Sequence, residues 1–184
     1  VIVATRLDLT IAVLSVVLVF LLGGLAGVAA GFFGGWTDRI VGRQPFLESM
    51  TAMAALAGRT RRMRFGMNVV SLAFRDPVLL AKQCATIDML SDGRLLPAFG
   101  IGSPLAPEWQ ALGIDTRTRG RRTDECLDII RRLWREESVD FSGTFYQLKG
   151  VTISPKPVQP DLPMWIGGST EAAIRRAARI GTGW

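Results

Sequence analysis

A long run of residues without charge opens the chain and divides it into two parts. Residues 9–37 contain no Asp, Glu, Lys or Arg, although charged residues make up 21% of the whole sequence. A helix needs about twenty apolar residues to cross the hydrocarbon core of a bilayer, so this run is long enough. We therefore divide the chain into a stub at 1–8, an apolar segment at 9–35 and a folded region at 36–184.

The glycines of the apolar segment favour a transmembrane helix. They recur every four residues, at Gly23, Gly27, Gly31 and Gly35. This spacing places small residues on one helix face, where membrane helices approach each other closely. A signal peptide fits less well, because the run is too long for one. The alternative is a buried strand and helix of a soluble domain, although an outer helix would carry charge on its solvent face.

The residue inventory excludes several kinds of catalytic site. The sequence has no histidine and two cysteines, Cys84 and Cys126. It cannot form a Ser-His-Asp triad or complete a zinc site from His and Cys ligands, so we expect no metal site of that kind. Two cysteines make no disulfide framework, which predicts a reducing, cytoplasmic compartment for this part. Proton transfer must then use carboxylates, Lys, Tyr or Cys, or a coenzyme must supply the chemistry.

The net charge of +6 raises the question of nucleic acid or anionic lipid as a partner. The arginines of the segment 121–125 are interleaved with acids at helical spacing, which indicates a solvated helix face. No basic run is interleaved with aromatic residues, as binding of single strands would require. We therefore expect no nucleic-acid partner, and we expect the excess charge to attract an anionic coenzyme.

From Gln44 onward, strand-like and helix-like patterns alternate. Asp76 followed by Pro77 predicts an N-cap and the first residue of a helix. The predicted strands are 63–70, 95–100 and 164–166, and the predicted hairpin is 139–146. The predicted helices are 45–56, 77–90, 118–136 and 171–180, with Gly93 and Gly181 as stops. This alternation predicts an α/β fold, a parallel sheet wrapped by helices.

Several motifs in the right order and spacing resemble a known family. They are WTDR from Trp36, DPVLLAKQCATIDMLSDGR from Asp76, FGIG from Phe99, GRRTDECLDIIRRLW, FSGTFY, PKPVQPDLPMWIGGS from Pro155 and AARIGTGW. Together they make 36–184 similar to the bacterial luciferase-like monooxygenases, and above all to the branch that uses the deazaflavin coenzyme F420. Each motif alone is weak, and the series is specific.

The resemblance implies an incomplete (β/α)8 barrel of the TIM type, with about four or five of the eight strands and the coenzyme at their carboxyl ends. It implies an oxidoreductase, a monooxygenase or dehydrogenase, that transfers hydride between F420 or FMN and a small organic substrate. It also implies a homodimer. F420 is favoured over FMN, and the resemblance identifies no catalytic side chain. The alternative is a membrane-tethered fragment of such a barrel without catalysis.

The resemblance carries over onto nine coenzyme-binding positions. Asp38 follows the second strand, where the family places polar contacts near the coenzyme ring, although many members have His where this chain has Arg39. Asn68 and Val69 occupy the place of a strand bulge with a non-proline cis peptide behind the ring. The remaining positions are Gly100 and Gly102, where the backbone would approach the coenzyme, and the phosphate-binding turn Gly167, Gly168, Ser169 and Thr170.

Three features of these segments lead to structural expectations. Ser169 is predicted to be the N-cap of the helix that follows the turn, whether or not phosphate binds there. Gly168→Val is expected to block the approach of the backbone to a phosphate while leaving thermal stability nearly intact. Pro97 lies inside the predicted strand 95–100. Because proline cannot donate to a ladder, it is expected only at an edge or a bulge.

Overall fold

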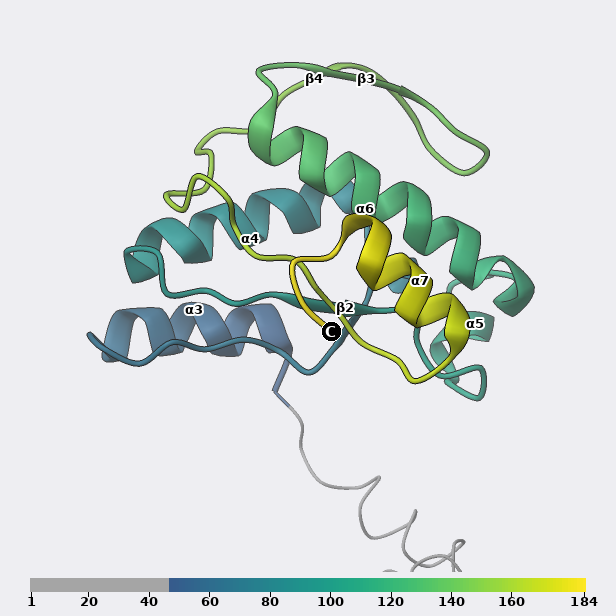
Figure 1. Ribbon diagram of the computed structural model, residues 1–184, viewed down its shortest axis with the longest axis horizontal. Coiled ribbons are helices and arrows are strands. Elements are labelled where there is room, and N and C mark those ends of the chain that lie inside the picture. The colour runs from purple at the N-terminus through teal and green to yellow at the C-terminus, as the bar shows by residue number, and fades with distance from the viewer. Residues whose placement is uncertain (1–46) are drawn as a thin grey trace, which may run out of the picture. The chain divides into compact units, whose positions relative to one another are not determined.

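The structure, a computed structural model, describes residues 47–184. The predicted apolar segment at 9–35 and Asp38 lie outside these described residues. Helices and strands alternate along the described part, as the sequence predicts (Figure 1). None of the described helices combines the length and the apolar character that crossing a bilayer requires.

The sheet consists of three parallel strands that follow one another in chain order. These are β1 (Val70–Ser71), β2 (Ala98–Gly100) and β5 (Trp165–Ile166), in the order β1-β2-β5. The register pairs Ser71 with Gly100 and Phe99 with Ile166. Parallel bridges from Phe65 to Leu95 and from Trp165 to Gly183 extend the pairing. Parallel strands joined through helices are the arrangement of a TIM-type barrel, so the predicted fold class is confirmed for this part.

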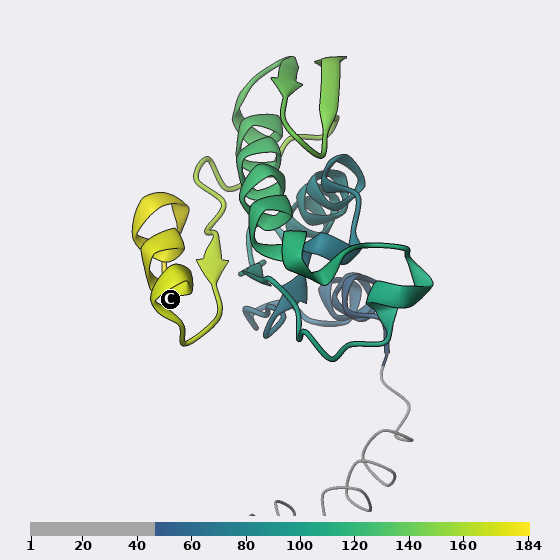
Figure 2. The same cartoon turned by 90° about the vertical axis from the view of Figure 1, so that its right-hand side faces the viewer.

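Four helices form a layer beside the strands. They are α3 (Ser49–Arg59), α4 (Pro77–Ser91), α6 (Arg119–Arg135) and α7 (Glu171–Ile180). Each packs against the next, α3 on α4, α4 on α6 and α6 on α7. The remaining elements are the short helices η1 (Leu72–Phe74), α5 (Glu108–Ala111) and η2 (Thr116–Thr118), and the hairpin of β3 (Val139–Ser142) and β4 (Gln147–Val151). The hairpin lies beyond α6, away from the sheet (Figures 1 and 2).

The core fills the space between the strands and the helices. Along β5 the exposure alternates, with Met164 at 3%, Trp165 at 43% and Ile166 at 2%. Side chains on a strand point to opposite faces in turn, so one face of β5 contributes to the core and the other does not. Phe99 of β2 is fully buried, and the Trp134 indole N–H donates to the Ala81 carbonyl (3.0 Å) between α6 and α4.

The predicted helix ends agree with the structure in most places. Asp76 accepts the Leu79 N–H (2.8 Å) as the N-cap of α4, and α7 has the predicted bounds. The prediction for the first helix, 45–56, was wrong in position, because α3 spans Ser49–Arg59. Glu48 is its N-cap and accepts the N–H groups of Met50 and Thr51. A glutamate seldom has this role, so the pattern did not reveal the start.

The predicted strands are longer than the observed ones. The strand predicted at 63–70 is reduced to a bridge at Phe65 and to β1, and the Asn68–Val69 peptide between them is cis. Pro97 comes directly before β2, which is the central strand of the described sheet. Pro97 is therefore not at an edge, but five residue steps from Phe65 to Val70 face four from Leu95 to Phe99, so the pairing contains a bulge at this level, in agreement with the expectation of an edge or a bulge. Proline is tolerated at the start of a strand, and the Pro97 carbonyl still accepts the Trp165 N–H (3.0 Å).

A buried carboxylate holds the proline-rich passage that leads into β5. Asp88 of α4 is fully buried and accepts both the backbone N–H (2.9 Å) and the side-chain amide (2.7 Å) of Gln159. The same amide donates to the Leu95 carbonyl (2.9 Å) at the start of the second strand segment. A buried polar group is costly unless it is hydrogen-bonded, so this network fixes the amino end of β5 against its neighbour.

Candidate functional site

Towards the carboxyl edge of the sheet, residues that lie in or next to the three parallel strands come together. Val69 precedes β1, while Gly100 ends β2 and Gly167 follows β5. A Cβ atom on Gly100 would lie 2.6 Å from Cγ2 of Val69, and one on Gly167 would lie 2.5 Å from Cγ1. The Val69 side chain therefore occupies the space that both glycines leave. Part of it remains exposed to solvent, at 37%.

Gly102 is explained by packing within the loop that follows β2. Its φ is +79°, which favours glycine, and a Cβ there would lie 3.2 Å from both the Ser71 hydroxyl and the Trp109 ring. The Trp109 ring packs on Phe74 with centroids 4.2 Å apart, and its indole N–H donates to the Ser103 carbonyl (2.7 Å). The buried Trp109 therefore anchors this loop at the carboxyl edge. Sequence reasoning missed it, although an isolated tryptophan in a loop of small residues is a usable signal.

The turn after β5 begins at Gly167, beside Val69, and carries several backbone N–H groups. The Gly167 N–H is already used, because it donates to the Phe99 carbonyl (2.8 Å). Thr170 is the N-cap of α7, and its side chain accepts the Ala173 N–H. The prediction that Ser169 is the N-cap was therefore wrong by one residue. Among the described atoms, the Ser169 and Thr170 N–H groups have no acceptor.

Gly168 and Trp184 fix the shape of this turn. Gly168 has a φ of +127°, and a Cβ atom there would lie 2.8 Å from the Ala173 Cβ. The expectation that Gly168→Val would spare stability was therefore wrong, because the valine would meet both backbone strain and the first turn of α7. The Trp184 indole N–H donates to the Gly168 carbonyl (2.7 Å), a contact that sequence reasoning did not foresee.

Comparison with known proteins decides the family. Residues 29–184 match the luciferase-like monooxygenase family. The chain belongs to this family. The match begins inside the apolar segment 9–35, so part of that segment lies within the family's own region. The boundaries 1–8, 9–35 and 36–184 stay predictions.

Relatives of this luciferase-like chain are longer proteins. An uncharacterized protein of Mycobacterium tuberculosis is 38% identical over 142 residues, which cover 77% of this chain and 48% of the relative. An F420-dependent glucose-6-phosphate dehydrogenase of Amycolatopsis mediterranei is 32% identical over 139 residues, 72% of this chain and 40% of the relative. The chain thus spans about half the length, or less, of the curated relatives it matches.

A solved structure supports the same fold. The monooxygenase RslO1 of Streptomyces bottropensis is 36% identical and superposes with a TM-score of 0.67. The match covers 72% of this chain and 40% of that chain. The described part of the luciferase-like chain is therefore similar to a portion of a larger barrel, in agreement with the predicted incomplete (β/α)8 fold.

The thiols of the luciferase-like chain do not supply a nucleophile at neutral pH. Burial raises the pKa of Cys84 to about 12. Burial also raises the pKa of Cys126 to about 11, although a hydrogen bond with Tyr146 and the charge of Arg122 lower it. The thiolate is the reactive form, so both side chains remain inert. Of the groups that the sequence left for proton transfer, cysteine is thus excluded.

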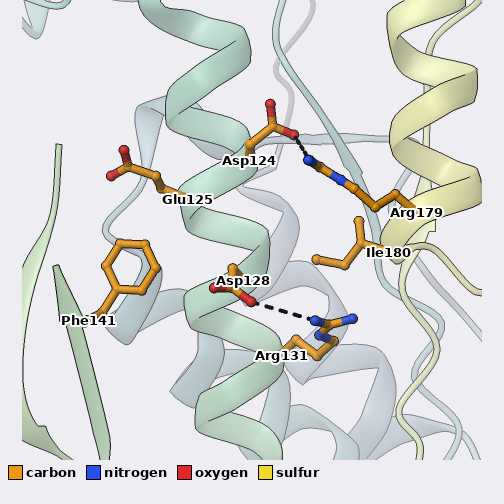
Figure 3. A pocket seen from close by; sticks show the side chains of 7 residues that line it. All are labelled: Asp124, Glu125, Asp128, Arg131, Phe141, Arg179 and Ile180. Atoms are coloured by element: carbon orange, nitrogen blue, oxygen red, sulfur yellow. Dashed lines mark hydrogen bonds and ion pairs between the residues drawn. The ribbon is translucent and has the colours of Figure 1, made fainter. Parts of the chain in front are cut away.

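A hollow on the helix layer is separate from the carboxyl edge. It lies between α6, α7 and the hairpin, and its lining residues are Asp124, Glu125, Asp128, Arg131, Phe141, Arg179 and Ile180 (Figure 3). Asp124 pairs with Arg176 and Arg179 of α7, at 2.8 and 2.7 Å. Glu125 accepts the N–H groups of the hairpin turn. These carboxylates hold elements of the fold together and are not a catalytic pair.

Proposed function

We propose that this chain forms the coenzyme-binding half of an oxidoreductase that acts on a small organic substrate. The coenzyme, when bound, supplies hydride transfer, and no protein nucleophile is needed. The observation that carries the proposal is the convergence of Val69, Gly100 and the turn after β5 at the carboxyl edge. In TIM-type barrels this edge carries the active site.

The residues at this edge fit a flat, partly anionic coenzyme. Val69 lies beside two glycines, which carry no side chain, and part of it is exposed, so a planar ring can contact it there. The Ser169 and Thr170 N–H groups and the positive end of the α7 dipole favour a phosphate beside it. Glu171 in the first turn of α7 opposes an anion, but Arg175 pairs with this carboxylate. Asn68 is exposed at the same edge.

Deazaflavin F420 is the coenzyme that we favour, with FMN as the alternative. The support comes from the F420-dependent relatives, of which one is 32% identical. Asp38, for which the family resemblance implies a polar contact near the ring, lies outside the described residues. The rival function is a membrane-tethered fragment that keeps this partial fold and binds neither coenzyme.

Fluorescence titration of the 184-residue chain with F420 and with FMN tests the proposal. We expect saturable quenching, with tighter binding of F420. Val69→Ala should weaken binding about tenfold, because the ring would lose contact with about two buried methyl groups. Val158→Ala is the matched control, because Val158 is also exposed and lies in the passage that leads to the opposite end of β5. A wild-type chain that binds neither coenzyme would favour the rival function.

A homodimer is a further part of the proposal. Met50, Ala54 and Ile87 line a groove between α3 and α4, and this face would contact a second copy. Light scattering coupled to size-exclusion chromatography should then give twice the mass of one chain. Ala54→Glu should reduce the mass to that of the monomer, since an unpaired charge at the centre of an interface is costly.

A further inference from the structure

A loop of arginines occupies the opposite, amino edge of the sheet. Helix α3 ends at Arg59, and the chain then passes through the segment 60–64 before it enters the strand region at Phe65 (Figure 1). The loop carries four exposed arginines: Arg59, Arg61, Arg62 and Arg64. We call this set the arginine loop. Neither the fold nor the proposed oxidoreductase function uses these side chains.

Arg94 holds the backbone of the arginine loop in one conformation. Its guanidinium donates to the carbonyl oxygens of Ala57 (3.1 Å), Thr60 (3.0 Å) and Met63 (2.8 Å). It also donates to the Thr60 hydroxyl (2.7 Å) and stacks over the Phe65 ring, 5.4 Å from its centroid. Because one guanidinium group binds all three carbonyl groups, the backbone of the loop is held in place. The four arginine side chains therefore start from fixed backbone positions.

Within the described residues 47–184, no carboxylate neutralises the positive charge of the arginine loop. None of its four arginines forms an ion pair with a carboxylate of the described residues. Asp92 is exposed at the neighbouring end of α4, but Arg94 follows it and offsets its charge. Residues 1–46 contain two acids, Asp8 and Asp38, which are too few to balance four arginines.

Apolar side chains lie exposed among these charges. Leu56 precedes the arginines and is 40% exposed, and Met63 lies between Arg62 and Arg64 and is 50% exposed. Met89 and Leu90 are exposed at the end of α4, which packs beside α3. A surface that mixes basic and aliphatic side chains matches the boundary between lipid headgroups and acyl chains. The segment 56–64 contains no aromatic side chain on which bases could stack.

We propose that the arginine loop binds an anionic lipid surface. Phosphate headgroups would pair with the guanidinium groups, which bind phosphate in a bidentate manner, and Leu56 and Met63 would enter the headgroup region. The loop lies at the amino ends of the strands, so a bound membrane would leave the carboxyl edge open. The proposal does not depend on the function proposed above or on the predicted helix at 9–35.

Vesicle sedimentation tests this proposal with a charge-matched pair of variants. The 184-residue chain is mixed with vesicles of phosphatidylcholine alone, or with vesicles of equal parts phosphatidylcholine and phosphatidylglycerol. The apolar segment would contribute equally to binding of both kinds of vesicle, so its contribution cancels in the ratio of the two partition coefficients. We expect R61Q/R62Q to lower this ratio about 25-fold, or about fivefold per arginine. R117Q/R121Q loses the same charge from exposed arginines of η2 and α6, and should change the ratio less than about twofold.

Three further measurements show whether the loss of binding in R61Q/R62Q reflects lost charge, a disturbed fold or binding to nucleic acid. R61K/R62K keeps the charge and should retain most of the wild-type preference, whereas a structural role would not be rescued. Salt at about 0.5 M should abolish the preference, because it screens exposed charges. Equal losses in R61Q/R62Q and R117Q/R121Q would overturn the proposal, since net charge would then explain the binding. Tight oligonucleotide binding that only R61Q/R62Q abolishes, without preference for phosphatidylglycerol, would also overturn it.

Discussion

The two ends of the parallel strands are built from opposite kinds of residue. The three strand segments together with the loops at their carboxyl ends, 65–74, 95–107 and 162–170, contain no charged side chain. The amino edge holds the arginine loop and Arg94. In a TIM-type barrel the carboxyl edge serves function and the amino edge serves stability. Here the carboxyl edge provides an uncharged surface and backbone N–H groups for the coenzyme. At the amino edge, Arg94 stabilises the fold and the arginine loop provides charge for contact with a lipid surface.

Replacing Arg94 at the amino edge should have the largest effect on the stability of the protein and no effect on coenzyme binding at the carboxyl edge. Arg94→Leu removes the side-chain donor of four backbone carbonyl oxygens, those of Ala57, Thr60, Met63 and Ser91. We expect it to reduce the free energy of unfolding by about 3 kcal/mol, as measured by urea denaturation. Arg64→Leu, in the same loop but exposed, should change it by less than about 0.5 kcal/mol. Coenzyme affinity of the folded protein should be unchanged in both, and a tenfold loss in Arg94→Leu would show that the two edges are coupled.

At the carboxyl edge, the next largest effect should come from the contact between Gly167 and Val69. A Cβ on residue 167 would lie 2.5 Å from the Val69 Cγ1. Gly167→Ala should therefore cost about 2 kcal/mol of stability through overpacking. Adding Val69→Ala should restore more than half of this loss, because the Val69 Cβ itself is 3.5 Å from that position. Additive losses in the double variant would show that Val69 does not cause the strain.

A helix glycine with open space around it is the control for this prediction. Gly58 lies in α3, and a Cβ there would meet no atom within 4 Å. Gly58→Ala should raise stability by up to about 1 kcal/mol, because alanine favours the helix. If Gly→Ala raises stability at residue 58 and lowers it at residue 167, the loss at residue 167 comes from packing at the carboxyl edge and not from adding a methyl group in general.

The sequence predicted elements well where the signal is local. Asp76 with Pro77 marked the start of α4, and α7 has the bounds that its pattern indicates. The sequence did not reveal contacts between segments that lie far apart along the chain. Gly100 and Gly167 look like ordinary turn glycines until the register brings Val69 between them. Glu48 as a cap, and Trp184 bonded to Gly168, likewise depend on tertiary structure rather than on spacing.

The turn after β5 gives the next prediction, because two neighbouring hydroxyl groups differ in role. Thr170 accepts the Ala173 N–H as the N-cap of α7, and Ser169 does not. Thr170→Ala should lower the free energy of unfolding by about 1 kcal/mol, the usual value of a cap. Ser169→Ala should change it by less than about 0.5 kcal/mol. If thermal unfolding showed the reverse order, the helix would begin one residue earlier than described.

The smallest expected effect concerns a charge pair that closes the first turn of α3. Burial raises the pKa of Glu48, but the N–H groups of Thr51 and Met50 and the Arg75 guanidinium lower it more, to about 2. Arg75 is 2.7 Å from the Glu48 carboxylate. Because the folded pKa lies below the ordinary value of 4.5, the unfolded chain binds the proton more readily. This stabilisation is therefore fully present above pH 4.5 and is lost as the pH falls towards 2.

Comparison of the wild type with Glu48→Gln over this pH range measures that contribution. The amide cannot carry the charge, so the melting temperature of the variant should be lower at neutral pH, and the difference should shrink as the pH falls below about 4. Because the side chain is half-exposed, the difference should be small, and about 0.5 M salt should reduce it further. A difference that stayed constant down to about pH 3 would mean that hydrogen bonding alone, and not charge, stabilises this end of α3.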